Sequence, residues 1–363
     1  MSRTRHGDAE LFFRDLIRGG GRLAEHADEA EVFYGALTGR RRAVPRLLDP
    51  PPALRRSEAY AEVNPVPTGP AIAVPAPRGV AYDGTYLYTV HRTAGEVRRF
   101  DSVASGAGTL IATLPRPANG VPVANNAFVG PTFVRNGAAN ELVIAEFGDL
   151  TVPDSAHGSG RIHALSTAGV YRGAIATRSG TFLWGPAGST DLGGGRLAQS
   201  SFWANRVTAM NVSDGASRVE VDFSGLSGRV GPDPLALHPS GNLVIGDRNN
   251  GRLLYAVPGG RAAELYTKLA DPIGITCLAG GDVVVVTKGK PSGMSSCLRI
   301  PVTSSGSRLT ATAARTLLDF PASLGRARGC TTIAISGRET VVVAIAVDGP
   351  PGPGDGLYFV DPS

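Results

Sequence analysis

The chain has 363 residues, a formal net charge of +5 and 18% charged residues, so it is long enough for one large folded domain and too poor in charge to be disordered throughout. Lysine occurs at only three positions, and the single tight basic run, residues 40–42, has no aromatic residues interleaved with it, which argues against nucleic-acid binding. No stretch approaches the ~20 apolar residues of a membrane helix, and no apolar targeting segment is recognisable, so we expect a soluble cytoplasmic protein with no membrane partner.

Residues 1–68 lack the strand pattern of the rest of the chain and predict a short helical N-terminal extension. Apolar residues within 11–17 share one face of a helix that Asp8 can cap, and residues 23–37 predict a second helix. Prolines at positions 45 and 50–52 then indicate a semi-rigid linker. Two interpretations stay open: the helices pack against the following domain, or they dock a protein partner.

The clearest strand pattern lies in residues 233–258. Leu235 and Leu237, and then Leu243 and Ile245, alternate with other residues at the period of two that β-strands require. Two glycine-containing turns separate three such strands, which together make most of one propeller blade. The arrangement recurs six times at a period of roughly 40 to 50 residues, which is typical of β-propellers.

We therefore predict an all-β fold, a six-bladed β-propeller, for residues 69–363. Candidate fourth strands lie between the copies, at residues 108–114, 170–176, 217–223 and 261–267. The sixth copy has no fourth strand after it, and an unpaired edge would remain. Residues 70–75, just before the first blade, are the natural donor of that strand, so we expect them to close the ring.

The geometry of a blade predicts where a ligand site lies. The start of each inner strand and the end of each second strand lie at the same rim, around the mouth of the central channel, where ligands of such folds bind. Inner-strand starts give Arg78, Asn126, Trp184, Asp233 and Asp271, and second-strand ends give His91, Glu146, Asp247, Lys288 and Asp348.

The segment Pro232-Asp233-Pro234 corresponds to a Pro-Asp-Gly turn in a known family. Residues 70–363 resemble the six-bladed group that contains the SMP-30/gluconolactonase-like hydrolases and the NHL-repeat proteins. The resemblance implies a divalent metal ion, calcium or magnesium, held in the channel by Asp233, which would help to activate water. The first-blade position of a metal-binding glutamate is Arg78 here, and no asparagine occurs near Trp184, so Asn126 and Glu146 are the candidates for the other oxygen ligands.

A second constellation consists of two histidines and a glutamate. His91 and Glu146 end equivalent strands of adjacent blades, and His157 lies in the long segment 147–160, which can cover the same rim. These side chains could bind a metal or perform acid–base catalysis, although structural polar residues are the plainer interpretation. Asp233, His91 and Glu146 are accordingly the candidate catalytic residues.

Arg78 changes the chemistry expected of the channel. An arginine cannot bind a metal, but it can clamp a carboxylate or phosphate with two hydrogen bonds. Alternatively, it pairs with Asp233 or Asp271 and holds neighbouring blades in register. Asp247, in contrast, is predicted to tie down the turn that follows it. The candidate substrate-binding residues are Arg78, Asn126, His157, Trp184 and Asp271.

The sequence favours a divergent enzyme that acts on a small molecule or peptide at the channel mouth, by hydrolysis, lactone opening or a lyase step. The alternative is a non-catalytic scaffold that binds a protein or peptide partner. Retention of Asp233 favours a ligand pocket, whereas the unmatched metal-binding positions favour the scaffold. The three cysteines are odd in number and irregularly spaced, so no disulfide framework is expected.

Overall fold

The computed structural model describes residues 67–101, 106, 108–115, 126–137, 140–149, 160–175, 185–289, 293–348 and 350–363. The helices predicted within residues 1–68 lie outside this part of the chain, apart from the last two residues of that range. Within it, the chain forms strands and one 3-10 helix, Ala322–Leu324. None of the described segments is a helix long and apolar enough to cross a membrane.

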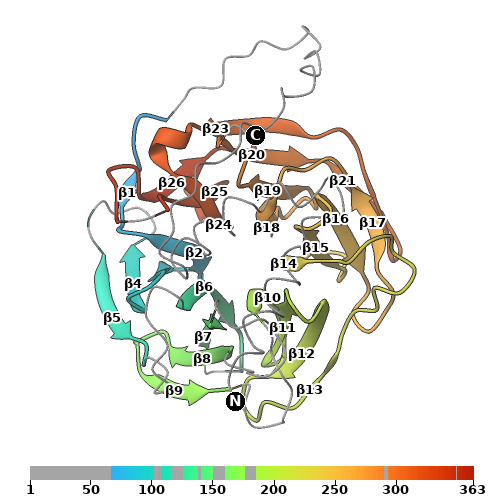
Figure 1. Ribbon diagram of the computed structural model, residues 1–363, viewed down its shortest axis with the longest axis horizontal. Helices are drawn as coiled ribbons and strands as arrows, with labels where there is room; N and C mark the ends of the chain where they lie inside the picture. Colours follow the sequence, from blue (N-terminus) through green and yellow to red (C-terminus); the bar gives the residue numbers. More distant parts are fainter. Residues whose placement is uncertain are drawn as a thin grey trace, which may run out of the picture. The chain divides into compact units, whose positions relative to one another are not determined.

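The strands form six four-stranded sheets arranged around a centre, which confirms the six-bladed propeller (Figure 1). From the centre outward, the blades are β2 (Pro77–Tyr82), β3 (Tyr86–His91), β4 (Glu96–Asp101) and β5 (Thr109–Thr113); β6 (Asn126–Val134), β7 (Glu141–Asp149), β8 (Arg161–Ser166) and β9 (Tyr171–Ala174); β10 (Pro186–Gly193), β11 (Arg196–Ser201), β12 (Arg206–Asn211) and β13 (Ser217–Val219); β14 (Pro232–Leu237), β15 (Leu243–Asp247), β16 (Arg252–Ala256) and β17 (Ala263–Tyr266); β18 (Pro272–Cys277), β19 (Val283–Thr287), β20 (Ser295–Ile300) and β23 (Arg315–Phe320); and β24 (Arg326–Ile335), β25 (Arg338–Ala346), β26 (Gly356–Val360) and β1 (Ile72–Ala73).

The ring closes as predicted, with a strand from the start of the propeller completing the last blade. Ile72 of β1 lies opposite Leu357 of β26, and the two strands run antiparallel. The Oδ2 atom of Asp355 accepts a hydrogen bond of 2.8 Å from the backbone N–H of Ala76, which fixes the chain between β1 and β2. Closure of this kind leaves no unpaired inner edge between the first and last blades.

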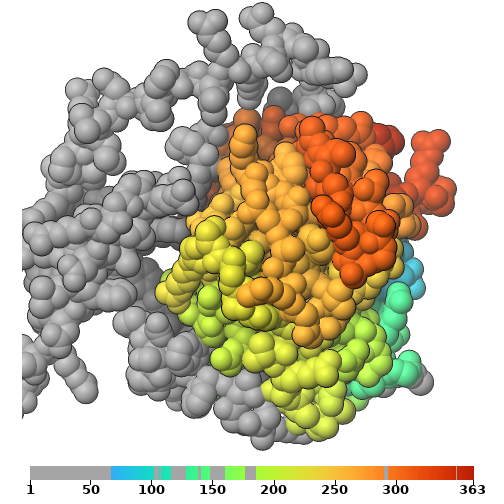
Figure 2. Space-filling model, turned by 90° about the vertical axis from the view of Figure 1, so that its right-hand side faces the viewer, coloured from blue at the N-terminus to red at the C-terminus, as the bar shows by residue number. Residues whose placement is uncertain are grey.

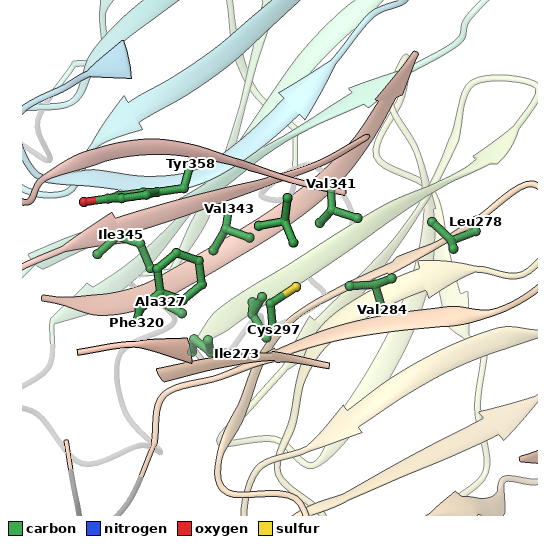
Figure 3. Packing of buried hydrophobic residues seen from close by; sticks show 12 residues of the cluster. Ile273, Leu278, Val284, Cys297, Phe320, Ala327, Val341, Val343, Ile345 and Tyr358 are labelled. Carbon is green, nitrogen blue, oxygen red and sulfur yellow. The ribbon is translucent and has the colours of Figure 1, made fainter. Parts of the chain in front are cut away.

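Each inner sheet is covered on both faces, so its strands read as continuous apolar runs. Val283 and Val285 of β19 face the fourth blade, whereas Val284 and Val286 face the sixth. In the close-up of Figure 3, Val284 lies with residues of β25 and with the ring of Phe320. That ring packs edge-on against Tyr358, with 5.3 Å between the ring centroids. The stability of the disc therefore resides mainly between blades.

The fifth blade contains a feature that the sequence pattern did not predict. A hairpin of β21 (Val302–Ser305) and β22 (Arg308–Ala311) follows β20, and the fourth strand of the blade is β23. The backbone N–H of Ala314 donates a 3.4 Å hydrogen bond to the hydroxyl of Tyr266 in β17, so this segment contacts the fourth blade. Figure 2 views the propeller from this side, with the fourth blade in yellow and the fifth in orange.

Glycines let the inner strands approach one another closely next to the predicted site. A Cβ atom on Gly79, which has a φ of +70°, would lie 2.4 Å from the Cα of Gly130. A Cβ on Gly274 would lie 2.7 Å from the Cα of Gly329. Only glycine fits at such contacts. The backbones of neighbouring inner strands thus touch one another at the residue after Arg78, which narrows the channel directly behind the rim.

Candidate functional site

One hydrogen bond repeats around the rim and aligns equivalent residues of four blades. In each, the first residue after the second strand donates its backbone N–H to the carbonyl oxygen of the residue before the inner strand. The donors and acceptors are Arg92 to Ala76, Phe202 to Gly185, Arg248 to Gly231 and Lys288 to Asp271, at 3.0 to 3.1 Å. Ala76 and Asp271 adopt left-handed φ values of +41° and +53°, which are uncommon for residues other than glycine.

The residues that end the second strands, one position earlier, bind within their own blades. The carboxylate of Asp247 accepts hydrogen bonds from the backbone N–H of Gly231, the amide of Asn250 and the guanidinium of Arg252, at 2.8 to 2.9 Å. Asp247 therefore ties down the following turn, as predicted. The same position in other blades is held by His91 and Glu146.

His91 and Glu146 are each engaged with a different partner. The Oε2 atom of Glu146 lies 2.7 Å from Nε2 of His163, both side chains are fully buried, and Nδ1 of His163 lies 3.1 Å from the hydroxyl of Tyr171. Nδ1 of His91 accepts the backbone N–H groups of residues 93 and 94, so a neutral His91 carries its proton on Nε2. Burial lowers the pKa of His91, which favours this neutral form.

Arg248 joins the two predicted acidic residues, Asp233 and Asp271. Its Nη1 atom lies 2.9 Å from Oδ2 of Asp233, while Nε and Nη2 bind the carboxylate of Asp271 at 2.5 and 3.1 Å. The guanidinium carbon lies 5.6 Å from the ring centroid of Phe202. Burial raises the pKa of Asp233, and the positive charges of Arg248 and Arg78 offset only part of that effect. Arg248 thus ties the fourth blade to the fifth.

A second charged cluster lies where the sixth blade meets the first. Asp348 bonds Nη2 of Arg328, and it lies 3.4 Å from Nη1 of Arg92 and 3.5 Å from Nε of Arg326. Burial acts to raise the pKa of Asp348, but the charges of Arg328, Lys288 and Arg92 outweigh it and lower that pKa to about 2. One carboxylate is therefore shared among several cations.

Arg78 lies between these two clusters and is paired with neither. Its guanidinium forms no hydrogen bond or ion pair with any residue that the structure describes, and its Nε atom is buried without a hydrogen-bond partner. The alternative in which Arg78 pairs with Asp233 or Asp271 is not formed, because Arg248 takes both carboxylates. Burial, followed by the charges of Arg328 and Arg92, lowers the pKa of Arg78 to about 9, so the group remains charged at neutral pH.

The rim carries an excess of positive charge in the described part of the chain. The cations are Arg78, Arg92, Arg248, Lys288, Arg326 and Arg328, and the carboxylates are Asp233, Asp271 and Asp348, which leaves three positive charges unbalanced. Basic groups that converge in this way attract anions and repel cations.

These contacts do not fit a divalent metal ion at Asp233. The carboxylate is already bonded to a guanidinium, and a second guanidinium, that of Arg78, acts on it electrostatically. No group of three or more potential His, Cys, Asp or Glu ligands occurs among the described residues. Calcium and magnesium require several oxygen ligands with net negative charge. The remaining candidates are placed only in part: Asn126 begins β6, its side chain is not described, and His157 and Trp184 lie outside the described residues.

Three aromatic rings lie beside the charged rim. Trp203, in the turn after β11, packs edge-on against Phe202 with 5.0 Å between centroids and against Phe147 with 6.3 Å. A Cβ atom on Gly185 would lie 2.5 Å from the indole of Trp203, so the rings leave room only for glycine there. Phe202 is also the ring that Arg248 covers.

Sequence reasoning found Arg78, Asp233 and Asp271 but missed Arg92, Arg248 and Phe202. The last three lie one residue beyond the second-strand ends that were considered. Because side chains alternate along a strand, that shift of one position separates residues that turn back into the blade from residues at the rim. The sequence signal was present in Asp247-Arg248 and Ser201-Phe202, where a polar strand end is followed by a larger side chain.

A separate cavity of about 310 Å³ lies between the second and third blades. Its lining includes Glu141 and Arg172, which form an ion pair of 3.7 Å, and Val212. Glu141 begins its strand, so this cavity lies at the end of the blade away from the channel mouth. None of the predicted site residues lines it.

Comparisons with known proteins agree on the fold. No family model matches the chain, and no curated protein matches it in sequence. Among solved structures, a PQQ-bound aldose sugar dehydrogenase from Streptomyces coelicolor is 14% identical, with a TM-score of 0.55 over 81% of this chain and 96% of that one. A catalytically inactive virginiamycin B lyase from Staphylococcus aureus, in complex with quinupristin, is 12% identical, with a TM-score of 0.51 over 79% and 95%.

A putative gluconolactonase is also matched, at 16% identity and a TM-score of 0.44 over 64% of this chain and 78% of that one. Identities this low describe architecture rather than activity. The fold of the family that the sequence resembles is therefore confirmed: the chain is a six-bladed β-propeller, closed by its first strand, with a cationic rim around the channel.

Proposed function

We propose that the chain binds a small anionic molecule at the channel mouth, with Arg78 as the central contact. One observation carries the proposal: a guanidinium with a buried, unbonded Nε lies among other cations instead of beside a carboxylate. A buried donor left without a partner costs about 1–3 kcal/mol, and more when the group is charged. A bound carboxylate or phosphate would supply the missing hydrogen bonds and the missing negative charge.

The surroundings of Arg78 suit an anion that arrives from outside the chain. Arg248 is occupied by two carboxylates, and Arg328 and Arg92 share Asp348. These pairs hold the neighbouring cations in place, while Arg78 keeps unsatisfied donors. The close backbone contact at Gly79 limits how deep a ligand can lie, so the anion is expected at the rim.

A chemical step on the bound molecule, by hydrolysis, lactone opening or elimination, is the finer part of the proposal. Asp233 is the predicted catalytic residue whose charge acts on Arg78, and its raised pKa is a property of groups that transfer protons. His91 and Glu146 have partners within their own blades. The scaffold alternative uses the same anion contact, for example to hold a peptide carboxylate, without any turnover.

The test is calorimetric titration of the full chain with inorganic phosphate and with malonate. We expect Arg78→Met to lower the affinity at least tenfold, since hydrogen bonds to charged groups contribute about 1.5–3 kcal/mol. Without ligand, Arg78→Met should unfold at the same temperature as the wild type or higher, because an unpaired buried charge has been removed. Arg206→Met, an exposed arginine at the start of β12, is the matched control and should leave the affinity within about twofold.

Two results would contradict the proposal. One is a wild-type protein that binds neither anion; the other is an Arg78→Met protein that binds them unchanged. Clear destabilisation of Arg78→Met without ligand would instead assign the side chain a structural role. A ligand that binds and is recovered chemically unchanged supports the scaffold alternative over the enzyme.

A further inference from the structure

The rim presents an exposed aromatic side chain next to the cations, and this position is unusual in the molecule. Six large apolar side chains are strongly exposed in the described part of the chain. Five of them lie on or beside outer strands or at the far end of a third strand: Leu110, Val170, Tyr171, Val219 and Val257. Trp203, which is 44% exposed, lies instead in the turn between β11 and β12, at the rim of the channel mouth.

The surroundings of Trp203 hold the indole in one position. The rings of Phe202 and Phe147 pack against it at interplanar angles of 82° and 76°, a favourable edge-to-face arrangement. Nη2 of Arg229 donates a 2.6 Å hydrogen bond to the Trp203 carbonyl oxygen, and the Phe202 N–H bonds the carbonyl oxygen of Gly185 at 3.0 Å. The exposed ring is therefore part of a rigid wall, which we name the aromatic wall: Phe147, Phe202 and Trp203.

The aromatic wall is continuous with the charged rim through Arg248. The Arg248 guanidinium covers Phe202 on one side and bonds Asp233 on the other. Asp233 is close enough to Arg78 for the charge of each to act on the pKa of the other. A molecule bound to the free donors of Arg78 would thus have a flat apolar surface within reach along the same rim.

From this arrangement we infer the class of ligand: a small molecule that carries an anionic group on an aromatic ring, such as an aryl phosphate or aryl carboxylate. The inference rests on the proposed function, because the anionic group is the one bound by Arg78. The ring of the ligand lies against Trp203 and removes apolar surface from water, while its anionic group satisfies the guanidinium. A purely polar anion would leave the aromatic wall exposed.

The experiment compares two probes that differ only in the ring, phenyl phosphate and methyl phosphate, by calorimetric titration of the full chain. The wild type should bind phenyl phosphate about tenfold more tightly, the range expected for one stacked aromatic contact. Trp203→Ala should abolish that preference and leave the affinity for methyl phosphate within about twofold. Trp203→Phe, which keeps an aromatic ring, should retain most of the preference.

The outcomes separate this inference from the proposed function. Equal affinity of the wild type for the two probes overturns the inference and leaves the anion site standing. A preference that survives in Trp203→Ala also overturns it, because the ring then binds elsewhere. Failure of the wild type to bind either probe overturns both proposals. Arg78→Met should weaken both probes by the same factor, which distinguishes the anion contact from the aromatic one.

Discussion

Arg248 and Arg78 lie on the same rim of the propeller, and their guanidinium groups have opposite surroundings. Arg248 bonds two buried carboxylates from two blades and covers an aromatic ring. Arg78 has other cations around it and an unbonded, buried Nε. Residue type and position are thus poor guides to role, and the set of partners decides it. The first arginine is expected to stabilise the disc, whereas the second is expected to serve a ligand.

The largest effect is expected from breaking the paired side of this comparison. Arg248→Met should reduce the free energy of unfolding by about 3–5 kcal/mol, because it leaves the carboxylates of Asp233 and Asp271 buried without that cation. Urea denaturation measures the change. As a control, Arg172→Met removes the exposed arginine of an ion pair with Glu141 and should cost at most about 1 kcal/mol. If both variants cost the same, Arg248 does not have the structural role described here.

A smaller effect is expected from Asp233→Asn. Arg248 keeps its two bonds to Asp271, so we expect a loss of about 1–2 kcal/mol, within the range for hydrogen bonds to charged groups. The loss should be the same with calcium, with magnesium or with a chelator, because the cationic surroundings do not suit a divalent ion. Thermal unfolding in the three conditions checks this. Stabilisation of the wild type by either metal, absent in Asp233→Asn, would restore the metal hypothesis.

The smallest effect concerns Asp348, the carboxylate that neighbours Arg78 without bonding it. Its pKa is lowered from 3.8 to about 2 in the folded protein, so its contribution to stability is present above pH 4 and is lost as the pH falls from 4 towards 2. The side chain is 44% exposed, and solvent screening limits this contribution to about 1 kcal/mol. The difference in unfolding free energy between wild type and Asp348→Asn should therefore shrink over that pH range. A constant difference would contradict the assignment.

The propeller could be predicted from the sequence because its signals are local and repeated. Alternating apolar residues such as Leu243 and Ile245, followed by turn glycines, recur in every blade, and a missing sixth fourth strand required a donor near Ile72. The hairpin of β21 and β22 carries the same local signals as a blade strand pair. Only its tertiary neighbour, Tyr266, distinguishes it, and that contact cannot be read from sequence.

The site could be predicted less completely, for a physical reason. Rim geometry identified Arg78 and Asp233, but the choice of partner depends on which side chain reaches farthest across the boundary between blades. Arg248 reaches both Asp233 and Asp271, and this leaves Arg78 without either. Such competition is settled by distances of a few ångströms between residues of different blades, so the sequence left the pairing open.

The closing strand has a consequence for how the protein is made. Ala76, at the end of the closing segment, bonds Asp355, a residue 279 positions later. At typical synthesis rates of about 5–20 residues per second, roughly 15–60 s pass between the translation of these two residues. During that interval the first blade has no sixth blade beside it, and Ile72 and Val74 have no partner strand. The seam is thus the last part of the disc to assemble, and a nascent chain exposes one apolar blade face until its final strands have been translated.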